Sequence, residues 1–280
     1  MTIVARLHSV NIGRHFRAFG LRGVAPELID PFLGVDHAWI SAPTFPPHPH
    51  AGFSAVSHLF LDSETGIANR DSLGTRNIIQ PGGLHWAVTG SGVVHEEFPA
   101  ETGQTVHMLQ IFVNLPEEIQ TKPPFVLGLE PHEVPVVQLP NACVRVPLGW
   151  FAEAQSPAKP PVEVCLLDIT LDAGASLSVP QKAGMNAFVL PIRGSLLING
   201  KQFESEDGDC PIFTGGEMSQ QIELTAGRNG ATVAVFCGRP LRQPVFWQGP
   251  MAFASQKTLA NAIESYRRGE MGSLKPGPDL

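Results

Sequence analysis

The sequence predicts an all-β protein made of two small antiparallel β-barrels, with a short helix near the C-terminal end. Glycine accounts for 28 and proline for 26 of the 280 residues. So many turn formers suit short strands joined by tight turns. Short apolar or alternating segments recur in residues 52–115 at the spacing typical of such strands. A similar series in residues 144–237 indicates a duplicated barrel.

Composition narrows the class of function. The formal net charge is −7 and no run of Lys or Arg occurs, so direct binding to nucleic acid is not expected. No apolar run reaches 18 residues, and basic residues interrupt the N-terminal segment, so neither a membrane span nor a signal peptide is expected. The four cysteines form no C-x-x-C pair. We therefore expect a cytoplasmic protein with reduced thiols, and a monomer.

The first barrel is expected in residues 1–130. Two edge strands are expected at 10–12 and 15–19, followed by a Pro-rich segment that must be extended or turned. Further strands then follow in quick succession, at 52–58, 66–71, 76–79, 85–88, 93–97 and 106–115. Alternation in the first of these places Phe53, Ala55 and Ser57 on one face.

The second barrel is expected in residues 131–280. Prolines punctuate residues 116–140, which favours a crossover rather than a long helix. Beyond it, Asn199-Gly200 is a strong hairpin signal between two apolar segments. The last histidine of the chain is His132, so this copy is predicted to hold no metal and to have a structural or lid role.

The tail has a different periodicity. Leu259, Ala262, Ile263 and Tyr266 recur at helical spacing in residues 255–269. Arginines in the last turn and Gly269 after it are typical of a helix end. We expect the apolar stripe of this helix to dock on a barrel.

Two short motifs in the first barrel carry the candidate chemistry. His48 and His50 are two residues apart, and so are His95 and Glu97. Because alternate side chains of a strand share a face, each pair can point the same way. If the two strands are neighbours, three imidazoles and one carboxylate converge, which suits iron, nickel, manganese, copper or zinc. The alternative is that these are ordinary packed or surface histidines, but two pairs bounded by turns favour a metal site.

Eight segments of the sequence together form one pattern: 47–53 (PHPHAGF), 70–74 (RDSLG), 81–82 (PG), 85–86 (HW), 89–97 (TGSGVVHEE), 109–116 (LQIFVNLP), 244–250 (PVFWQGP) and 262–266 (AIESY). Together they resemble one known family, the pirins, which are bicupins of the cupin superfamily. The resemblance is dense over residues 30–116, thinner in the second barrel, and returns near the tail.

The resemblance implies a metal-binding N-terminal cupin with His48, His50, His95 and Glu97 as ligands, and a C-terminal cupin without metal. Fe(II) is the metal it implies, with nickel, manganese, copper and zinc left open. Some pirins cleave the flavonol quercetin with dioxygen, and others are transcriptional co-regulators or bind partner enzymes. Family membership therefore leaves two functions open, a quercetin 2,3-dioxygenase and an iron-dependent regulatory protein that binds a protein partner without turnover.

For the enzyme, the expected substrates are a small aromatic flavonol and dioxygen. The flavonol 3-oxygen would bind the metal, and Glu97 would be either a ligand or the catalytic base that takes the hydroxyl proton. Ring cleavage would release carbon monoxide and a depside. Phe53, Trp86 and Gln110 are candidates for the pocket wall, and core packing is the alternative for each.

The sequence departs from the pirin pattern at three positions. Ala51 stands where many pirins have Arg, which weakens an anion-binding or redox-reporting role there. His58 and His85 stand where Tyr and Gln are common. His58 is expected to be structural, because eight residues of extended strand span about 26 Å from His50. For His85, a place at the mouth of the pocket is considered.

Overall fold

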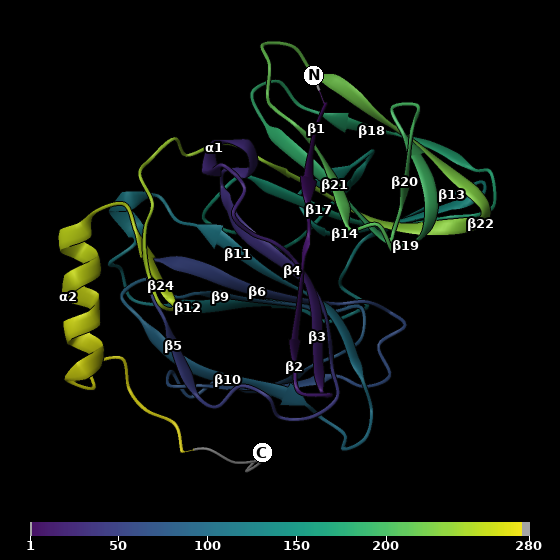
Figure 1. The fold of residues 1–280 in the computed structure, drawn as a ribbon. Coiled ribbons are helices and arrows are strands. Elements are labelled where there is room, and N and C mark those ends of the chain that lie inside the picture. Colours follow the sequence, from purple (N-terminus) through teal and green to yellow (C-terminus); the bar gives the residue numbers. More distant parts are fainter. Residues whose placement is uncertain (1, 276–280) are drawn as a thin grey trace. The chain divides into compact units, whose positions relative to one another are not determined.

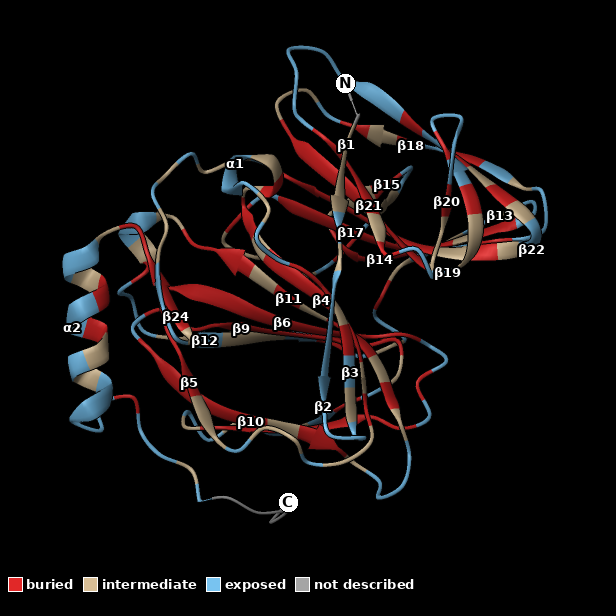
Figure 2. Cartoon of the chain, viewed as in Figure 1, coloured by how far each residue is buried: buried red, intermediate tan, exposed pale blue. Residues whose placement is uncertain are grey.

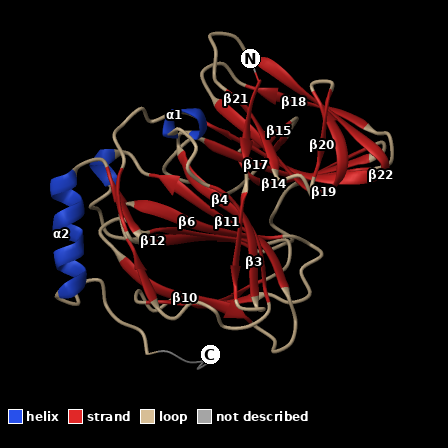
Figure 3. Ribbon diagram, viewed as in Figure 1, coloured by secondary structure: helices blue, strands red, loops and turns tan. Residues whose placement is uncertain are grey.

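The computed structural model describes residues 2–275. Strands dominate it (Figure 3), and helix is confined to α1 (Pro26–Ile29), the 3₁₀ turn η1 (Glu117–Ile119) and α2 (Gln256–Arg267). Every strand pair of the large sheet of unit 1 (residues 2–9, 19–34 and 132–240) is antiparallel, and so are the pairs β5–β10, β10–β7, β7–β8, β12–β9, β9–β6 and β6–β11. The all-β prediction is confirmed. The sheets are open and form β-sandwiches. The expectation that they close into barrels is therefore corrected, while the cupin-type fold is retained.

The chain divides into two compact units, each assembled from separate segments. Unit 1 contains the chain up to Ser9, Phe19–Gly34 and His132–Pro240, and unit 2 contains Val10–Ala18, Val35–Pro131 and the chain from Leu241. The division into 1–130 and 131–280 as functional domains stays a prediction. In the structure, the short N-terminal segments are shared between the units and the C-terminal segment belongs to unit 2.

Unit 1 is built on one large sheet. Its strand order is β1-β21-β19-β22-β17-β14-β13, with β18 beside β22 and β20 beside β19. The hairpin predicted at Asn199-Gly200 joins β19 to β20, and both residues have the positive φ (48° and 79°) that such a turn requires. The bounds are β1 (Thr2–Arg6), β13 (Val136–Leu139), β14 (Ala142–Leu148), β17 (Val164–Leu171), β18 (Ser176–Gln181), β19 (Asn186–Ile198), β20 (Lys201–Glu204), β21 (Asp209–Phe213) and β22 (Gln220–Gly238), with a small pair β15 (Trp150–Phe151) and β16 (Ala154–Gln155).

Unit 2 has two facing sheets (Figure 1). The larger has the order β12-β9-β6-β11-β4-β3-β2 and the smaller β5-β10-β7-β8. A hydrogen bond from Ser57 on the larger sheet to Glu97 on the smaller shows that their inner faces meet. The bounds are β2 (His8–Ile12), β3 (Phe16–Leu21), β4 (Phe32–Ile40), β5 (His48–His50), β6 (Phe53–Leu59), β7 (Ile67–Asp71), β8 (Arg76–Ile79), β9 (Leu84–Val88), β10 (Val93–Pro99), β11 (Val106–Asn114) and β12 (Phe125–Leu129).

The central strands of unit 2 are buried along their whole length (Figure 2). Every residue of β6 and β9 is buried. An apolar cluster that includes Leu59, Ile67 and Met108 fills one end of the sandwich. His48 and His50 of β5 and His95 of β10 are not part of this cluster.

The C-terminal segment packs against the outer side of the histidine-bearing sheet of unit 2. It contains β23 (Phe246–Gln248), β24 (Met251–Phe253) and α2. Leu259 and Ala262 of the helix cluster with Ala51 and Val94, so the predicted docking of the tail helix is seen here. The approach is close enough that a Cβ at Gly52 would lie 2.0 Å from a backbone oxygen of the tail. Among the described residues, no helix is long and apolar enough to cross a membrane.

Candidate metal centre

Three histidines meet on the inner face of the smaller sheet of unit 2. Strands β5 and β10 pair antiparallel, with His95 opposite His48 and Val93 opposite His50. Since alternate residues share a face, this register brings all three imidazoles together. One ring nitrogen from each lies within 4.8 Å of the others. Within residues 2–275, this is the one group of three or more His, Cys, Asp or Glu side chains close enough to hold a metal ion.

The hydrogen bonds of the histidines fit metal binding. The Nδ1 atoms of His48 and His50 lie 3.0 and 3.2 Å from the carbonyl oxygens of Pro46 and Pro250. A carbonyl only accepts, so each Nδ1 carries the proton and each Nε2 keeps a lone pair, as in most histidine metal ligands. The Nε2 atoms of His48 and His95 are 3.1 Å apart. A metal ion held by both rings would bring the two nitrogens about this close together.

Burial keeps these histidines neutral. Desolvation lowers the pKa of His48, lowers that of His50 to about 3, and holds that of His95 well below its ordinary value. The neighbouring imidazoles add to the effect on His50 and His95 because each disfavours a positive charge on the next. Neutral imidazole is the form that binds a metal, so no proton has to leave these rings near neutral pH.

Glu97 shares the inner face of β10 with His95 but has a different partner. Both carboxylate oxygens accept from the Ser57 hydroxyl, at 3.0 and 2.9 Å. Burial raises the pKa of Glu97 to about 7, and the Ser57 hydrogen bond opposes that rise. The three-nitrogen cluster comprises the histidines, and the Glu97 carboxyl lies beyond it beside Ser57. The role of Glu97 as ligand or base stays a prediction.

Glu96 points to the other face of β10. It is buried and pairs with Arg70, whose Nε lies 2.9 Å from the Glu96 carboxylate. Arg70 also donates to the carbonyl oxygen of Lys275, at 2.6 Å. This ion pair therefore ties the tail to the back of the histidine-bearing sheet.

The three predicted pocket residues lie in different places. The Phe53 ring is 5.2 Å from that of His50 and 5.5 Å from that of Trp247, so Phe53 borders the histidines. The Gln110 Oε1 atom lies 3.2 Å from the Ser57 hydroxyl oxygen, so Gln110 lies next to the Glu97 environment. Trp86 is fully buried on the opposite face of β9 from His85. The structure therefore brings Phe53 and Gln110 to the site, and places Trp86 in the core.

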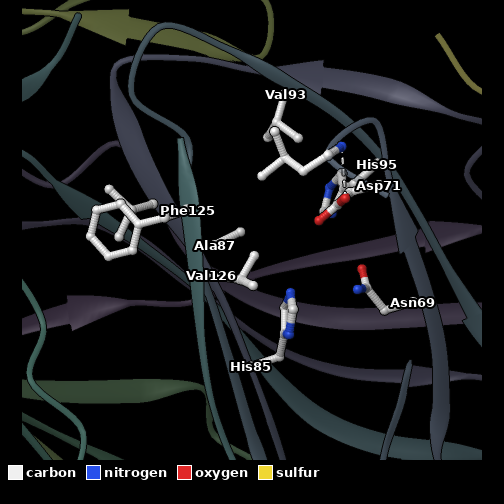
Figure 4. Close-up of a pocket in the computed structure, with 10 residues that line it drawn as sticks. Asn69, Asp71, His85, Ala87, Val93, His95, Phe125 and Val126 are labelled. Atoms are coloured by element: carbon white, nitrogen blue, oxygen red, sulfur yellow. Dashed lines mark hydrogen bonds between the residues drawn. The ribbon is translucent and has the colours of Figure 1, made fainter. Parts of the chain in front are cut away.

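A small hollow adjoins the cluster and shares His95 with it (Figure 4). Asn69, Asp71 and His85 form its polar lining, and the remaining residues are apolar: Leu73, Ala87, Val88, Val93, Phe125 and Val126. Sequence reasoning considered His85 but missed Asn69 and Asp71. The register could have indicated them, because Asn69 is opposite Glu97 and Asp71 is opposite His95.

His58 and His107 lie outside the cluster. His58 is fully buried, and its Nδ1 lies 3.1 Å from the carbonyl oxygen of Gly83. His107 contacts the carboxylate of Asp62 at 2.6 Å and the Nε2 of His37 at 2.7 Å. Both positions agree with structural roles for these two histidines.

The fold and site define a bicupin in which one unit carries a cluster of three histidines that could hold a metal ion. Comparison with known proteins gives the family. A family model named pirin matches residues 22–113, and a model of the pirin C-terminal cupin domain matches residues 166–272. Human pirin is 30% identical over 97% of this chain and 93% of its own length. The chain belongs to the pirin family.

Two further relatives bear on function. A Pseudomonas aeruginosa protein named "Putative quercetin 2,3-dioxygenase" is 30% identical over 95% of this chain and 94% of its own length. A crystal structure described as quercetin 2,3-dioxygenase from Acinetobacter baumannii has a TM-score of 0.86 at 26% identity, covering 97% of this chain and 98% of that one. An Escherichia coli pirin crystallised with nickel(II) shares the fold, with a TM-score of 0.67 at 15% identity.

Proposed function

We propose that this chain is a non-haem iron dioxygenase that cleaves a flavonol such as quercetin. The observation that carries the proposal is the convergence of three neutral imidazoles on one point beside a partly apolar hollow. Such a set leaves coordination positions open for a substrate and dioxygen. The names of the Pseudomonas and Acinetobacter relatives support the reaction class.

His48, His50 and His95 would hold the ion, with Glu97 as the fourth ligand or as a base close by. A ferrous ion there would supply Lewis acidity toward the flavonol 3-oxygen and the redox chemistry that dioxygen requires. Fe(II) is the proposed metal, and nickel, manganese, copper and zinc are the alternatives that a reconstitution must compare.

The chain's own residues would prepare the substrate. A carboxyl group whose pKa is about 7 is half ionised near neutral pH and suits proton transfer. Glu97 would take the proton of the 3-hydroxyl on a carboxylate oxygen, while Ser57 keeps that carboxylate oriented. The aromatic rings of Phe53, Phe112 and Trp247 lie in contact with one another or with His50. They would exclude water and strengthen the electrostatic interactions of the site.

The test is oxygen-dependent loss of the flavonol. Protein loaded anaerobically with Fe(II) is mixed with quercetin and then exposed to air, and both flavonol absorbance and carbon monoxide are measured. We expect catalytic loss of quercetin with one carbon monoxide released for each molecule cleaved. His50→Ala is the control and should show neither. The enzyme is rejected if the protein binds one equivalent of iron without consuming quercetin and the nickel, manganese, copper and zinc forms are inactive too. That result would favour an iron-dependent regulatory protein.

A further inference from the structure

The His50 imidazole is supported by a segment 200 residues further along the chain. We propose that the C-terminal hairpin, residues 246–253, positions this imidazole for metal binding, and that Gln120 is the positioning residue that holds the hairpin in place. The inference rests on the proposed function only in that a metal ion binds the histidine cluster, and it does not require turnover. It predicts that metal affinity, and not only the stability of the fold, depends on Gln120.

The hairpin contacts the end of β5 at two successive residues. The Pro250 carbonyl oxygen, at the turn of the hairpin, accepts from the Nδ1–H of His50 at 3.2 Å. Ala51, the next residue, forms a parallel bridge with Met251, and its carbonyl oxygen accepts from the N–H of Ala252 at 3.1 Å. Strands β5 and β24 accordingly lie side by side in Figure 1. Because the acceptor of the His50 ring belongs to the hairpin, any shift of the hairpin moves that acceptor.

The hairpin and the chain after β5 are packed without space between them. Gly52 has a φ of 84°, and a Cβ there would lie 2.0 Å from the backbone oxygen of Ala252 and 2.9 Å from the ring of Phe253. The Phe253 side chain is buried in the same apolar cluster as Ala51. The position of the Pro250 carbonyl therefore depends on where the hairpin is anchored.

The first anchor of the hairpin is Gln120, which directly follows η1 and is 1% exposed. Its Oε1 accepts from the N–H of Ala254, directly after β24, at 2.8 Å. Its Nε2 donates to the Oδ1 of Asn114, the last residue of β11, at 3.2 Å. An amide can accept from one partner and donate to the other at once, which no apolar side chain can do. Without Gln120 the buried Ala254 N–H loses its partner, which destabilises the docked hairpin.

The second anchor is Gln243, which lies just before the hairpin and is partly buried. Its Nε2 donates to the carbonyl oxygen of Leu115 at 2.7 Å, and its Oε1 accepts from the N–H of Glu117 at 3.1 Å. The two glutamines thus attach both ends of the hairpin to residues 114–120. All of these residues belong to unit 2, as His50 does.

The hairpin affects metal binding through the His50 ring. The hydrogen bond to Pro250 keeps the proton on Nδ1 and fixes the direction of the Nε2 lone pair. A ring without this acceptor rotates more freely and exchanges between two tautomers, and only one of them presents a lone pair on Nε2. Loss of such a partner lowers metal affinity by about 10–100-fold in other histidine sites. A purely structural Gln120 would instead affect the stability of the fold and leave the affinity of the folded chain unchanged.

The first experiment compares three variants of the full chain with the wild type. Ni(II) affinity at pH 7 is measured by competition with a metal-buffering chelator, and the ¹⁵N signals of the His50 ring are recorded on metal-free protein. Gln120→Leu should lower affinity about tenfold and replace a single Nδ1-protonated tautomer by an averaged signal. Gln243→Ala should lower affinity about threefold, because it removes a partly exposed anchor. Met108→Ala is the control: it opens the apolar cluster that contains no histidine, and it should destabilise the fold while leaving affinity within about twofold.

The second experiment uses the wild type, so it decides the matter even if Gln120→Leu does not fold. Coupling between two sites is reciprocal, so a docked hairpin that raises Ni(II) affinity tenfold must itself be stabilised tenfold by Ni(II). Hydrogen exchange of the N–H groups of Ala252 and Ala254 should therefore slow about tenfold when Ni(II) binds, under conditions in which amides exchange by local opening. The N–H of Glu64, which donates to the carbonyl oxygen of Thr105 at 3.0 Å, is the control and should not change.

Wild-type affinity in folded Gln120→Leu, an equal loss of affinity in Met108→Ala, or exchange at Ala252 and Ala254 that Ni(II) leaves unchanged would overturn the inference. The proposed function is judged separately. If the coupling holds while iron-loaded protein fails to consume quercetin, the dioxygenase proposal falls and the positioning role stands. If quercetin is consumed while Gln120→Leu binds metal as the wild type does, only the positioning role falls.

Discussion

The hydrogen bond from Ser57 to Glu97 can be removed without touching any histidine of the cluster. The hydroxyl lies 3.0 and 2.9 Å from the two carboxylate oxygens. It stabilises the charged form and so lowers the pKa of Glu97, against the burial that raises it to about 7. A hydrogen bond to a charged group contributes about 1.5–3 kcal/mol, and each pH unit is worth about 1.4 kcal/mol. Ser57→Ala should therefore raise the pKa of Glu97 by about one to two.

Loss of the Ser57 hydroxyl should weaken metal binding at neutral pH. Protonated Glu97 cannot bind a metal or act as a base, and at pH 7 its ionised fraction would fall from about a half to about 1–10%. We expect metal affinity at pH 7 to fall about 5–50-fold in Ser57→Ala, and the deficit to shrink to about twofold or less at pH 9, where the carboxyl ionises again. The histidines add no such dependence, because burial already keeps them neutral.

Affinity is measured by competition with a metal-buffering chelator, using Ni(II) as a redox-inert probe at both pH values. Ser54→Ala is the matched control: Ser54 lies on the other face of the same strand, is fully buried, and has no hydrogen-bond partner for its hydroxyl among the described residues. It should leave affinity unchanged at both pH values. An equal loss at pH 7 and pH 9 in Ser57→Ala would refute the reasoning, and so would no loss at pH 7.

Three further predictions concern the same sandwich. Glu97→Gln keeps the size but loses the charge, so turnover per bound iron should fall about 10²–10⁴-fold; an unchanged value per iron would leave Glu97 as a replaceable ligand at most. His50→Ala should abolish stoichiometric iron binding while the circular dichroism of the folded protein is retained, and full iron occupancy would refute its assignment. Glu96→Ala leaves Arg70 buried and unpaired, which should destabilise the protein by about 3–5 kcal/mol in denaturant unfolding; a loss below about 1 kcal/mol would contradict the ion pair's role.

Local patterns in the sequence were enough to predict much of this fold. The spacing of glycine and proline marked the turns, and alternation placed Ser57 on the same face of its strand as Phe53. Only the structure shows that this is the inner face, where Ser57 meets Glu97. The spacing of His48 and His50 required only a strand to share a face, and the strand register then determined that His95 lies opposite His48. Such features depend on residues close in sequence, so they can be predicted without a structure.

Other features depend on contacts between distant segments. Nothing near His50 in the sequence indicates that the carbonyl of Pro250 would accept from its ring. Asn69 resembles an ordinary strand residue until its register opposite Glu97 is known. Trp86 shows that residue type alone does not locate a side chain, because an aromatic ring suits a pocket and a core equally well. Which face of the sheet the residue lies on decides between them.

The central claim is that the three histidines hold an iron ion that makes this pirin a flavonol dioxygenase. The most direct measurement is the rate of quercetin loss in air as Fe(II) is titrated into metal-free wild-type protein, alongside His50→Ala. We predict that activity rises in proportion to bound iron and levels off at one equivalent per chain, with none in the variant. A wild-type protein that binds one equivalent of iron and leaves quercetin intact would contradict the claim, as would a His50→Ala variant with undiminished turnover.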